Sequence, residues 1–360
     1  MKPRVKVALV GFGFAGQTFH APLISSTPGM ILDTVVSSDP AKVHVRHPQA
    51  RVVAHAPEAF ADPEIDLVVI AAPNAMHAPL ATAALAHGKH VVVDKPFALD
   101  VQQAREVVAQ AERANRIVSV FQNRRWDSDF LTLRALMDQG SLGEIVEFHS
   151  HFDRYRPSVA DRWRERDLPG SGLWFDLGPH LLDQALQLFG PPQAVFADLA
   201  RQRDSAHVDD YFQVLLRYPR LRVSLHGGSL VAANGLRLAV HGTRASYVKH
   251  GMDAQEDALR EGIVPGAAGW GEDRQPGKLH TPGDTGNSIE TVPGVPGDYI
   301  AFYRAMHAAI VHGHRAPVSA DDALQVMALL EMAVRSSRER RECEWEEGRS
   351  LSPPSERRGV

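Results

Sequence analysis

The chain opens with the feature that most constrains its fold, a Gly-x-Gly-x-x-Gly motif placed directly after a β-branched, apolar run. The run covers residues 5–10, and Gly11, Gly13 and Gly16 follow it at once. The first glycine permits a tight turn, the second lets the backbone approach a pyrophosphate, and the third lets the helix pack closely on the strand. A strand, a glycine turn and a helix N-terminus in this order predict dinucleotide binding. The predicted cofactor-binding residues of this turn are Gly11, Phe12, Gly13, Phe14, Ala15 and Gly16.

Length and composition limit the class of protein. A chain of 360 residues is long for a single core, so we expect two domains. Its 44% of hydrophobic and 23% of charged residues are typical of a soluble globular protein. A formal net charge of -4 offers no basic face for nucleic acid, and no apolar run approaches the roughly 18 residues of a membrane span. Because the N-terminus has no signal-peptide pattern and Cys343 is the single cysteine, we expect a cytoplasmic protein without an internal disulfide.

The first part of the chain alternates between strand and helix patterns, which is typical of an α/β fold. Its strand segments are continuous apolar runs, as expected for a parallel sheet with helices on both faces. These patterns predict a Rossmann domain, a doubly wound parallel sheet, over residues 1–122. The predicted strands are residues 5–10, 31–36, 65–71, 90–93 and 117–121, and the predicted helices are residues 15–25, 78–86 and 101–114.

After residue 122 the pattern changes to several short strands with turns between them, which predicts a mostly antiparallel or mixed sheet. We expect an α+β domain with a large open-faced sheet over residues 123–338. Residues 339–360 are expected to form a mobile, charged tail. The predicted strands are residues 144–153, 194–200, 211–218, 222–227, 236–241 and 246–249, and the predicted helices are residues 130–139, 181–188, 254–261, 298–312 and 320–338.

The tip of the second strand bears on the choice between NAD and NADP. An acidic residue about 20 positions after the glycines would bind the ribose 2′-hydroxyl of NAD and repel the 2′-phosphate of NADP. Ser37 stands at the expected place, Ser38 follows it, and Lys42 is within reach. Small hydroxyls and a cation favour NADP, with NAD as the alternative. If Asp39 rather than Ser37 faces the ribose, the preference reverses.

Asp94, Lys95 and Pro96 follow the predicted strand 90–93 directly. Open α/β sheets bind their ligands at the C-terminal ends of such strands. A residue before proline favours an extended conformation, which would direct Lys95 from the strand tip into the crevice. There its ammonium could hydrogen-bond a substrate oxygen and stabilise negative charge on it. A lysine on the surface is the alternative.

Asp176, His180 and Asp183 are spaced i, i+4, i+7 and would share one face of a helix. Histidine transfers protons readily near pH 7, and a neighbouring carboxylate can fix its tautomer. Pro179 must either begin this helix or kink it. Asp176 and His180 therefore predict either an acid–base site or a structural contact within a helix.

Together these segments resemble the Gfo/Idh/MocA family of NAD(P)-dependent oxidoreductases along nearly the whole chain. The family usually has glutamate where this chain has Asp94, a mild departure because the lysine and proline are kept. Residues 11–22, 122–130, 151–157 and 182–185 resemble the branch that contains bacterial NADP-dependent scyllo-inositol dehydrogenases. The motifs that carry the family resemblance are Gly11-x-Gly13-x-x-Gly16, Ala72-Pro73-Asn74-x-x-His77, Gly88-Lys89-His90-Val91-x-x-Asp94-Lys95-Pro96 and Asp176-x-x-x-His180.

The resemblance implies a role for each site residue. Lys95 and His180 would hold the reacting hydroxyl, while Asp176 would bind substrate and orient His180. In oxidation His180 would take the hydroxyl proton as hydride passes to the nicotinamide C4, and in reduction it would return the proton. The residues implied near the cofactor are Ala72, Pro73, Asn74, His77, Asp94, Lys95 and Gln122. The residues implied for the substrate pocket are Arg124, Arg125, Tyr155 and Trp163.

Other polar groups have ordinary explanations. Glu147, His149, His151 and Asp153 share one face of a predicted strand, as metal ligands could. The family needs no metal, and its second-domain sheet commonly packs on another subunit. We therefore expect no metal and interpret these residues as the interface of a homodimer or homotetramer. The charged run 161–166 either contributes to the pocket or forms a solvated face, and Cys343 is not expected to be a nucleophile.

The sequence thus predicts an NADP-dependent oxidoreductase that interconverts a secondary alcohol and a ketone on a polyol or sugar such as scyllo-inositol. One alternative is a reductase of another small molecule, such as a dihydrodiol or a tetrapyrrole. Another is a non-catalytic regulator that senses NAD(P), which the retention of both Lys95 and His180 disfavours. Neither nucleic acid nor a membrane is an expected partner.

Overall fold

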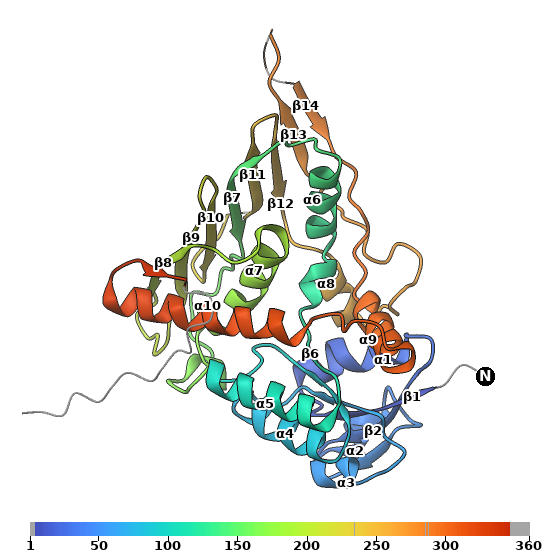
Figure 1. The fold of residues 1–360 in the computed structure, drawn as a ribbon. Helices are drawn as coiled ribbons and strands as arrows, with labels where there is room; N and C mark the ends of the chain where they lie inside the picture. The colour runs from blue at the N-terminus through green and yellow to red at the C-terminus, as the bar shows by residue number, and fades with distance from the viewer. Residues whose placement is uncertain (1–3, 234, 285, 287, 346–360) are drawn as a thin grey trace, which may run out of the picture.

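The computed structural model describes residues 4–345 of the chain, apart from residues 234, 285 and 287. The N-terminal domain is a six-stranded parallel sheet in the order β3-β2-β1-β4-β5-β6, with helices on both faces (Figure 1). The predicted Rossmann fold is therefore confirmed. The strands are β1 (Val5–Val10), β2 (Met30–Val36), β3 (Arg51–Val53), β4 (Leu67–Ile70), β5 (His90–Val93) and β6 (Val118–Val120). The helical segments are η1 (Gly16–His20), α1 (Ala21–Ser25), α2 (Pro40–His44), α3 (Ala56–Phe60), η2 (Asn74–Met76), α4 (His77–Ala86) and α5 (Val101–Ala114).

The strand order of this sheet determines where a ligand can bind. Strand β1 lies between β2 and β4, so the order of the strands along the chain reverses there. In open α/β sheets such a reversal leaves a crevice at the carboxyl ends of the strands. Gly11 follows β1 directly, and Lys95 stands two residues after the end of β5. The glycine turn and the lysine are therefore brought to the same edge of the sheet.

The C-terminal domain is built on a nine-stranded sheet in the order β14-β13-β12-β11-β7-β10-β9-β8-β15. Its strands pair antiparallel except β7 and β10, which run parallel, so the predicted mixed sheet is confirmed. The strands are β7 (Ile145–His151), β8 (Ala194–Ala200), β9 (Tyr211–Arg217), β10 (Arg222–Gly228), β11 (Leu236–Gly242), β12 (Ser246–His250), β13 (Lys278–Thr281), β14 (Ser288–Thr291) and β15 (Cys343–Glu344).

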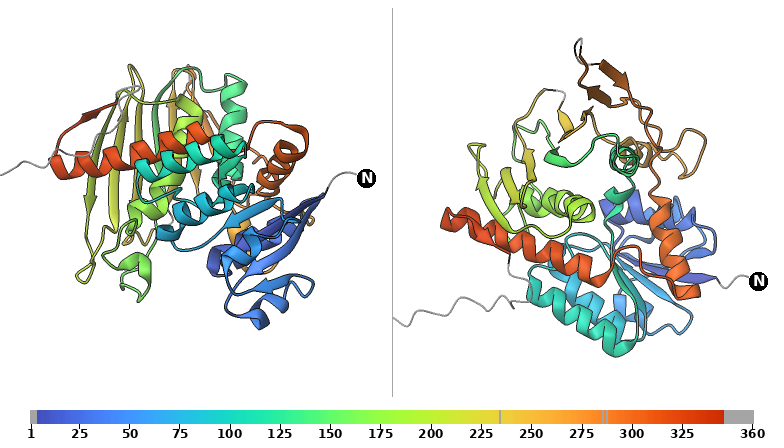
Figure 2. Two further views of the ribbon diagram at one scale, coloured as in Figure 1. Left: turned by 60° about the horizontal axis from the view of Figure 1, so that its bottom comes forward. Right: turned by 45° about the horizontal axis from the view of Figure 1, so that its top comes forward.

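Helices cover one face of the nine-stranded sheet and tie it to the Rossmann domain. The segments are η3 (Asn123–Trp126), α6 (Ser128–Asp138), η4 (Trp163–Glu165), α7 (Leu173–Phe189), α8 (Gln255–Arg260), α9 (Ile300–His312) and α10 (Ala320–Glu339). Helix α10 packs on β8 and α7 in its own domain and on α5 and β6 in the other (Figure 2). Among the described residues, no helix lies on the opposite face of this sheet.

Local capping explains why several helices begin where the sequence predicts. Asp100 precedes α5, and its carboxylate accepts a hydrogen bond from the Gln103 N–H at 2.7 Å. Ser319 precedes α10, and its hydroxyl accepts from the Asp322 N–H at 3.1 Å. These bonds satisfy backbone donors that the first helical turn leaves without a partner.

Helix α7 differs from the prediction of a helix over residues 181–188. It begins at Leu173 and continues through Pro179, which lies inside it. Proline removes one backbone hydrogen bond, so the sequence predicts a helix start or a kink at Pro179, whereas the helix begins six residues earlier. Tertiary packing offsets this cost, because the buried Trp174 packs on Phe212 of β9 and donates to the Leu330 carbonyl of α10 at 3.1 Å.

The predicted charged tail begins later than residue 339. Glu339 ends α10, and Cys343 with Glu344 pairs with β8 as the edge strand β15. Cys343 is a free cysteine that is only 1% exposed, because it packs into the core of the second domain. The rest of the predicted tail, residues 346–360, lies outside the described residues.

The helices of the C-terminal domain are long but amphipathic. Helix α10 has 20 residues and α7 has 17, and both carry polar side chains along their length. Within the described part of the chain, no helix is both long and apolar enough to cross a membrane.

A buried ion pair between η3 and α7 should contribute strongly to stability. Arg125 donates to the two carboxylate oxygens of Asp183 at 2.6 and 2.8 Å, and also reaches Asp322 of α10 at 3.0 Å. Without Asp183 the largely buried Arg125 would keep only Asp322, which is partly exposed. Breaking a buried pair costs about 3–5 kcal/mol, and the remaining contact with Asp322 places the expected cost near the lower end of this range. We expect Asp183→Ala to lower the free energy of unfolding by this amount, measured by urea denaturation.

The control is Asp161→Ala, which removes the exposed partner of Arg166. Exposed pairs contribute about 0–1 kcal/mol, so this variant should unfold almost like the wild type. Equal effects of the two substitutions would show that the buried pair does not hold η3 against α7.

Candidate active site

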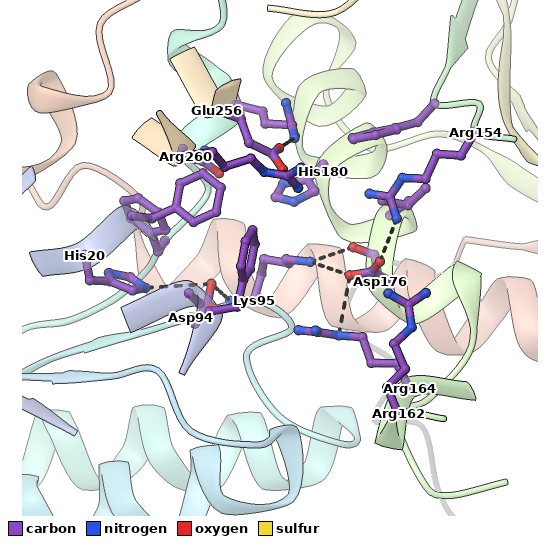
Figure 3. Close-up of a pocket in the computed structure, with 18 of the residues that line it drawn as sticks. His20, Asp94, Lys95, Arg154, Arg162, Arg164, Asp176, His180, Glu256 and Arg260 are labelled. Atoms are coloured by element: carbon purple, nitrogen blue, oxygen red, sulfur yellow. Dashed lines mark hydrogen bonds and ion pairs between the residues drawn. The ribbon is translucent and has the colours of Figure 1, made fainter. Parts of the chain in front are cut away.

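A cavity of about 330 Å³ lies where the Rossmann crevice meets helix α7. Its walls include Lys95, Asp176 and His180, the three predicted catalytic residues (Figure 3). Lys95 comes from the end of β5, whereas Asp176 and His180 lie one turn apart on α7. The two domains therefore contribute reactive groups to the same space, of a size that suits a small molecule.

Lys95 and Asp176 are linked directly across the domain boundary. The Lys95 ammonium donates to Asp176 Oδ1 at 3.0 Å and to the Asp176 backbone carbonyl at 2.7 Å. The surface alternative for Lys95 is wrong, because its side chain is largely buried in the cavity wall. Two of its three donors are thus used by one residue, which leaves the third for a substrate oxygen.

Asp176 lies among cations. Arg154 donates to its Oδ2 at 3.2 Å, and Arg164 Nε lies 3.6 Å from its Oδ1. Burial alone would raise the pKa of Asp176, but Lys95, Arg154 and Arg164 more than offset this and hold the pKa well below its usual range. The carboxylate is therefore ionised throughout the neutral range.

His180 is neutral in the same environment. Burial lowers the pKa of His180, and the charges of Lys95 and Arg124 lower it further, well below its ordinary value of 6.5. A neutral imidazole can accept a proton from a hydroxyl group. Its Nδ1 is buried and has no hydrogen-bond partner among the described residues. The expected orientation of His180 by Asp176 is not found, because the carboxylate is bonded to Lys95 and Arg154 instead.

The glycine turn has the geometry that a dinucleotide requires. Gly11 has a φ of +97°, and a Cβ on it would lie 2.6 Å from the Ala71 carbonyl oxygen. A Cβ on Gly16 would lie 2.1 Å from the Gly11 carbonyl oxygen, so helix and strand can approach only with glycine there. At Gly13, by contrast, a Cβ would meet no atom within 4 Å. The open space over Gly13 fits the approach of a pyrophosphate.

The rest of the turn lies between this space and the cavity. Phe12 is buried, whereas Phe14 and Ala15 line the cavity beside the glycines. Phe14 is 5.1 Å from the guanidinium carbon of Arg260, which packs over its ring. The predicted turn residues are therefore together at the mouth of the site.

Asp39 carries the one carboxylate at the tip of β2, and this carboxylate already accepts a hydrogen bond. Asp39 is the N-cap of α2 and accepts from the Lys42 N–H at 3.0 Å. Ser37 and the exposed Ser38 precede it, and Ser37 Oγ accepts from the Asp39 N–H at 3.1 Å. The Lys42 ammonium donates to the Phe12 carbonyl at 3.2 Å, which places a cation beside the glycine turn.

Several residues implied near the cofactor hold the backbone of the site. The ring nitrogens of His77 lie 2.7 and 2.9 Å from the carbonyls of Pro96 and Ala72, so His77 supports the segment after Lys95 and does not line the cavity. Asn74 donates to the Gly170 carbonyl at 2.9 Å. Gln122 is buried next to the cavity residues Phe121 and Asn123. Asp94 lines the cavity, whereas Ala72 and Pro73 do not.

Of the four residues implied for the substrate pocket, one lines the cavity and three do not. Arg124 lines the cavity and pairs with Glu256 at 2.8 Å. Tyr155 is 60% exposed and is not among the residues that line the cavity. Trp163 also lies outside it and packs under the Arg164 guanidinium, 4.7 Å from the ring. Arg125 is committed to Asp183, as described above.

His20 is a cavity residue that the sequence analysis did not assign. It is fully buried, its Nδ1 lies 2.6 Å from the Tyr303 hydroxyl, and its Nε2 lies 4.0 Å from Asp94. Burial is the main reason that the pKa of His20 falls to about 4. The stretch from Phe19 to Pro22 resembles the family branch, and this was the available signal.

The segment after β7 contributes four arginines to the cavity, two of them from the charged run 161–166. Within the charged run 161–166, Arg162 and Arg164 line the cavity while Arg166 points to solvent. The run therefore contributes in part to the pocket and in part to a solvated face. The four cavity arginines in this part of the chain are Arg154, Arg156, Arg162 and Arg164.

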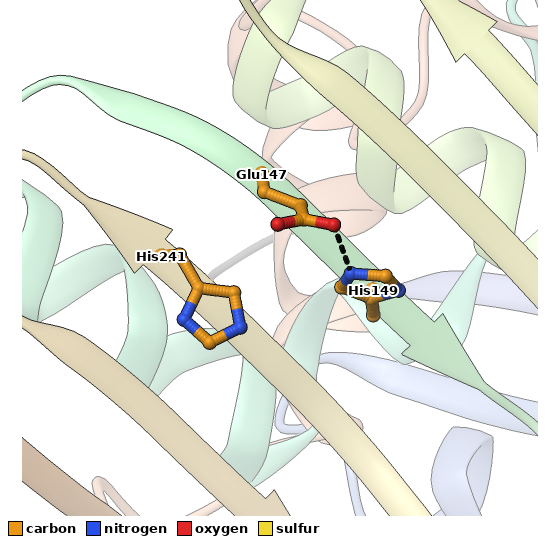
Figure 4. Close-up of side chains that lie close together, drawn as sticks. All are labelled: Glu147, His149 and His241. Atoms are coloured by element: carbon orange, nitrogen blue, oxygen red, sulfur yellow. Dashed lines mark hydrogen bonds and ion pairs between the residues drawn. The ribbon is translucent and has the colours of Figure 1, made fainter.

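The four polar residues on one face of the predicted strand 144–153, which could resemble metal ligands, belong to two groups rather than one. Glu147 and His149 of β7 approach His241 of β11 (Figure 4), whereas His151 and Asp153 approach His226 of β10. Within each group the ligand atoms lie within 4.8 Å of one another. The sequence could not show the histidines of the neighbouring strands, which strand pairing brings in. No residue of either group lines the cavity.

Comparisons with known proteins agree with this architecture. A family model described as "Oxidoreductase family, NAD-binding Rossmann fold" matches residues 5–122, and a second, "Oxidoreductase family, C-terminal alpha/beta domain", matches residues 134–345. Both models carry the family name Gfo/Idh/MocA. The chain belongs to the Gfo/Idh/MocA family. As a member of this family, it is an NAD(P)-dependent oxidoreductase.

Similar proteins cover nearly the whole Gfo/Idh/MocA chain. The oxidoreductase YdgJ of Escherichia coli is 50% identical over 94% of this chain and 98% of its own. The scyllo-inositol 2-dehydrogenase (NADP(+)) IolW of Bacillus subtilis is 39% identical over 94% of this chain and 95% of its own. The solved structure of YPO2259 from Yersinia pestis has a TM-score of 0.92 at 47% identity, covering 96% of this chain and 98% of that one.

The glycine turn allows cofactor binding and folding to be tested separately. Gly13→Ala adds a methyl group to the open space, so we expect the fold to be unchanged while the Kd for NADPH rises at least tenfold, about 1.4 kcal/mol. Gly16→Ala should instead lower the thermal midpoint, because its Cβ overlaps the Gly11 carbonyl. Fluorescence of bound NADPH and thermal denaturation provide the two measurements. Normal NADPH affinity in Gly13→Ala would mean that the dinucleotide does not lie over this glycine.

Proposed function

We propose that this enzyme is NADP-dependent and interconverts a secondary alcohol and a ketone on a polyol or sugar. The observation that carries the proposal is the presence of Lys95 and a neutral His180 in one cavity beside the glycine turn. A bound nicotinamide nucleotide would accept or supply the hydride. The protein must then hold the substrate oxygen and move one proton.

Lys95 and His180 suit these two tasks. The ammonium of Lys95 is held by Asp176, so it can donate to the substrate oxygen and stabilise negative charge as the proton leaves. The neutral imidazole of His180 takes that proton in oxidation and returns it in reduction. Asp176 positions Lys95 and, as an ionised carboxylate, can accept a hydrogen bond from a second hydroxyl of the substrate. None of these steps calls on a metal ion.

The tip of β2 supports NADP as the preferred cofactor. Asp39 Oδ1 accepts from the Lys42 N–H at the start of α2, so this carboxylate is directed at the helix, and Ser37 stands where a ribose-binding acid is expected. Ser37, Ser38 and Lys42 can donate to such a phosphate. The relative IolW is an NADP-dependent scyllo-inositol 2-dehydrogenase by name, which supports both the cofactor and a polyol substrate.

We also propose that the enzyme is a homodimer or homotetramer that associates through the nine-stranded sheet. One face of the sheet has no helix over it in the described chain (Figure 2). Phe196 on this face is exposed, and the two histidine groups lie among its polar side chains. A sheet with an uncovered, partly apolar face is suited to pack on a second copy.

Lys95→Ala and His180→Ala should each reduce turnover by roughly 100-fold or more, the usual loss for a general acid–base or an electrostatic stabiliser. Binding of NADPH should persist in both variants, measured by its fluorescence. Turnover is followed by the absorbance of reduced nicotinamide over a panel of polyols and sugars. The controls are Lys278→Ala and His207→Ala, which change exposed residues outside the cavity. Near-normal turnover in either test variant would remove that residue from the chemistry.

Ser37→Asp should move the cofactor preference from NADP toward NAD. The new carboxylate would repel the 2′-phosphate and accept from the ribose hydroxyls of NAD. A charge-assisted hydrogen bond contributes on the order of 1.5–3 kcal/mol, so the ratio of kcat/KM values should change at least tenfold.

Asp39→Asn is the matched control, because asparagine also caps helices and should leave the preference unchanged. If the wild type already prefers NAD, and Asp39→Asn abolishes that preference, Asp39 rather than Ser37 faces the ribose.

A further inference from the structure

The cavity carries more positive charge than the proposed chemistry uses. Seven lysine and arginine side chains and three carboxylates line it, which leaves four positive charges in excess while its histidines are neutral. Much of the excess comes from one loop after β7, whose four cavity arginines we call the arginine group. The arginine group consists of Arg154, Arg156, Arg162 and Arg164.

Arg156 is the member of the arginine group whose charge is least compensated. Arg154 and Arg164 share Asp176, and Arg162 pairs with Glu165 at 2.7 Å. Among the residues that the structure describes, no carboxylate pairs with the guanidinium of Arg156. Burial lowers the pKa of Arg156, and the neighbouring cations, Arg154 first, lower it further. A bound anion would relieve this repulsion.

Arg203 holds in place the loop that carries the arginine group. This side chain is only 4% exposed and pairs with Asp210 at 2.8 Å and Glu165 at 2.7 Å. It also donates to the backbone carbonyls of Arg156 and Ser158, at 3.3 Å each. The loop is therefore fixed before a ligand arrives, which reduces the entropy cost of binding.

The cofactor phosphates are the competing explanation for these arginines. Figure 3 shows His20 and Asp94 on one side of Lys95, and Asp176 with Arg154 on the other. The cation that packs against the glycine turn is Arg260, over Phe14. Arg154 and Arg164 contact Asp176 of α7, so these two members of the arginine group lie beside the substrate-binding carboxylate rather than at the glycine turn.

We propose that the arginine group binds an anionic group of the substrate, a carboxylate or a phosphate, so that the enzyme acts on an acidic polyol or sugar in preference to a neutral one. This inference rests on the proposed function and narrows its substrate class. The planar fork of arginine matches the two oxygens of a carboxylate or phosphate. The reacting hydroxyl would lie between Lys95 and His180, with the acidic group at the far end of the cavity.

Anion binding can be measured without turnover. Enzyme saturated with NADPH is titrated with inorganic phosphate or with malonate, and the thermal midpoint is followed to obtain a Kd. We expect Arg156→Gln to raise the Kd for the preferred anion at least tenfold. The matched control is Arg166→Gln, which removes a cation from the same loop that pairs with the exposed Asp161 outside the cavity. It should bind the anion like the wild type.

Kinetics then connect the site to the substrate. We expect kcat/KM for glucuronate or glucose 6-phosphate to exceed that for glucose at least tenfold, and Arg156→Gln to remove this advantage mainly through KM. The better of the two substrates identifies carboxylate or phosphate as the recognised group.

Two results would overturn the inference. One is equal anion affinity in the wild type and Arg156→Gln together with weaker NADPH binding in the variant, which would assign Arg156 to the cofactor. The other is turnover of neutral polyols without any preference for acidic ones. If no sugar or polyol is turned over but anion affinity depends on Arg156, the proposed function fails and the anion site stands.

Discussion

The ion pair between Lys95 and Asp176 is the contact on which the site depends. It joins the carboxyl end of β5 in the Rossmann domain to the first turn of α7 in the other domain. Helix α10 packs on both domains, so the two halves are held in register around this contact. A shift of either domain would separate the group that stabilises the substrate oxygen from the group that moves its proton. The ion pair therefore links the stability of the domain interface to the geometry of the chemistry.

Burial and the surrounding cations together explain the opposite charge states of two neighbouring residues. Burial is the main reason that the pKa of His180 is low, and nearby cations lower it further, whereas for Asp176 burial raises the pKa and the cations more than offset this. A lower pKa keeps an aspartate ionised, whereas it keeps a histidine neutral. The same lysine and arginines thus prepare one residue as a fixed anion and the other as a proton acceptor. Charge that remains uncompensated among these cations, above all at Arg156, is available for a ligand.

Local sequence patterns predicted the structure correctly where it depends on residues that are close together in the chain. The apolar runs of β1, β4 and β5, the glycine turn and the starts of α5 and α10 each depend on a few residues, and each lies where the sequence predicts it. The short strands β3, β13 and β14 were not predicted, because they form by pairing with strands that already exist. Helix α7 was predicted too short, since Pro179 locally favours a helix start that the packing of Trp174 on β9 and α10 overrides.

The sequence by itself determined the Rossmann domain and the cofactor turn, because each depends on a short motif with its own physical requirement. Local motifs left Lys95, Asp176 and His180 open to other interpretations, and only the resemblance to the family implied that they share one site. Only the tertiary structure decided the partners of these residues. In the structure Asp176 contacts Lys95 and the arginines rather than His180. His20 lines the cavity, and Tyr155 lies outside it. Such contacts join segments far apart in the chain. No local pattern records them, because they depend on how two domains pack.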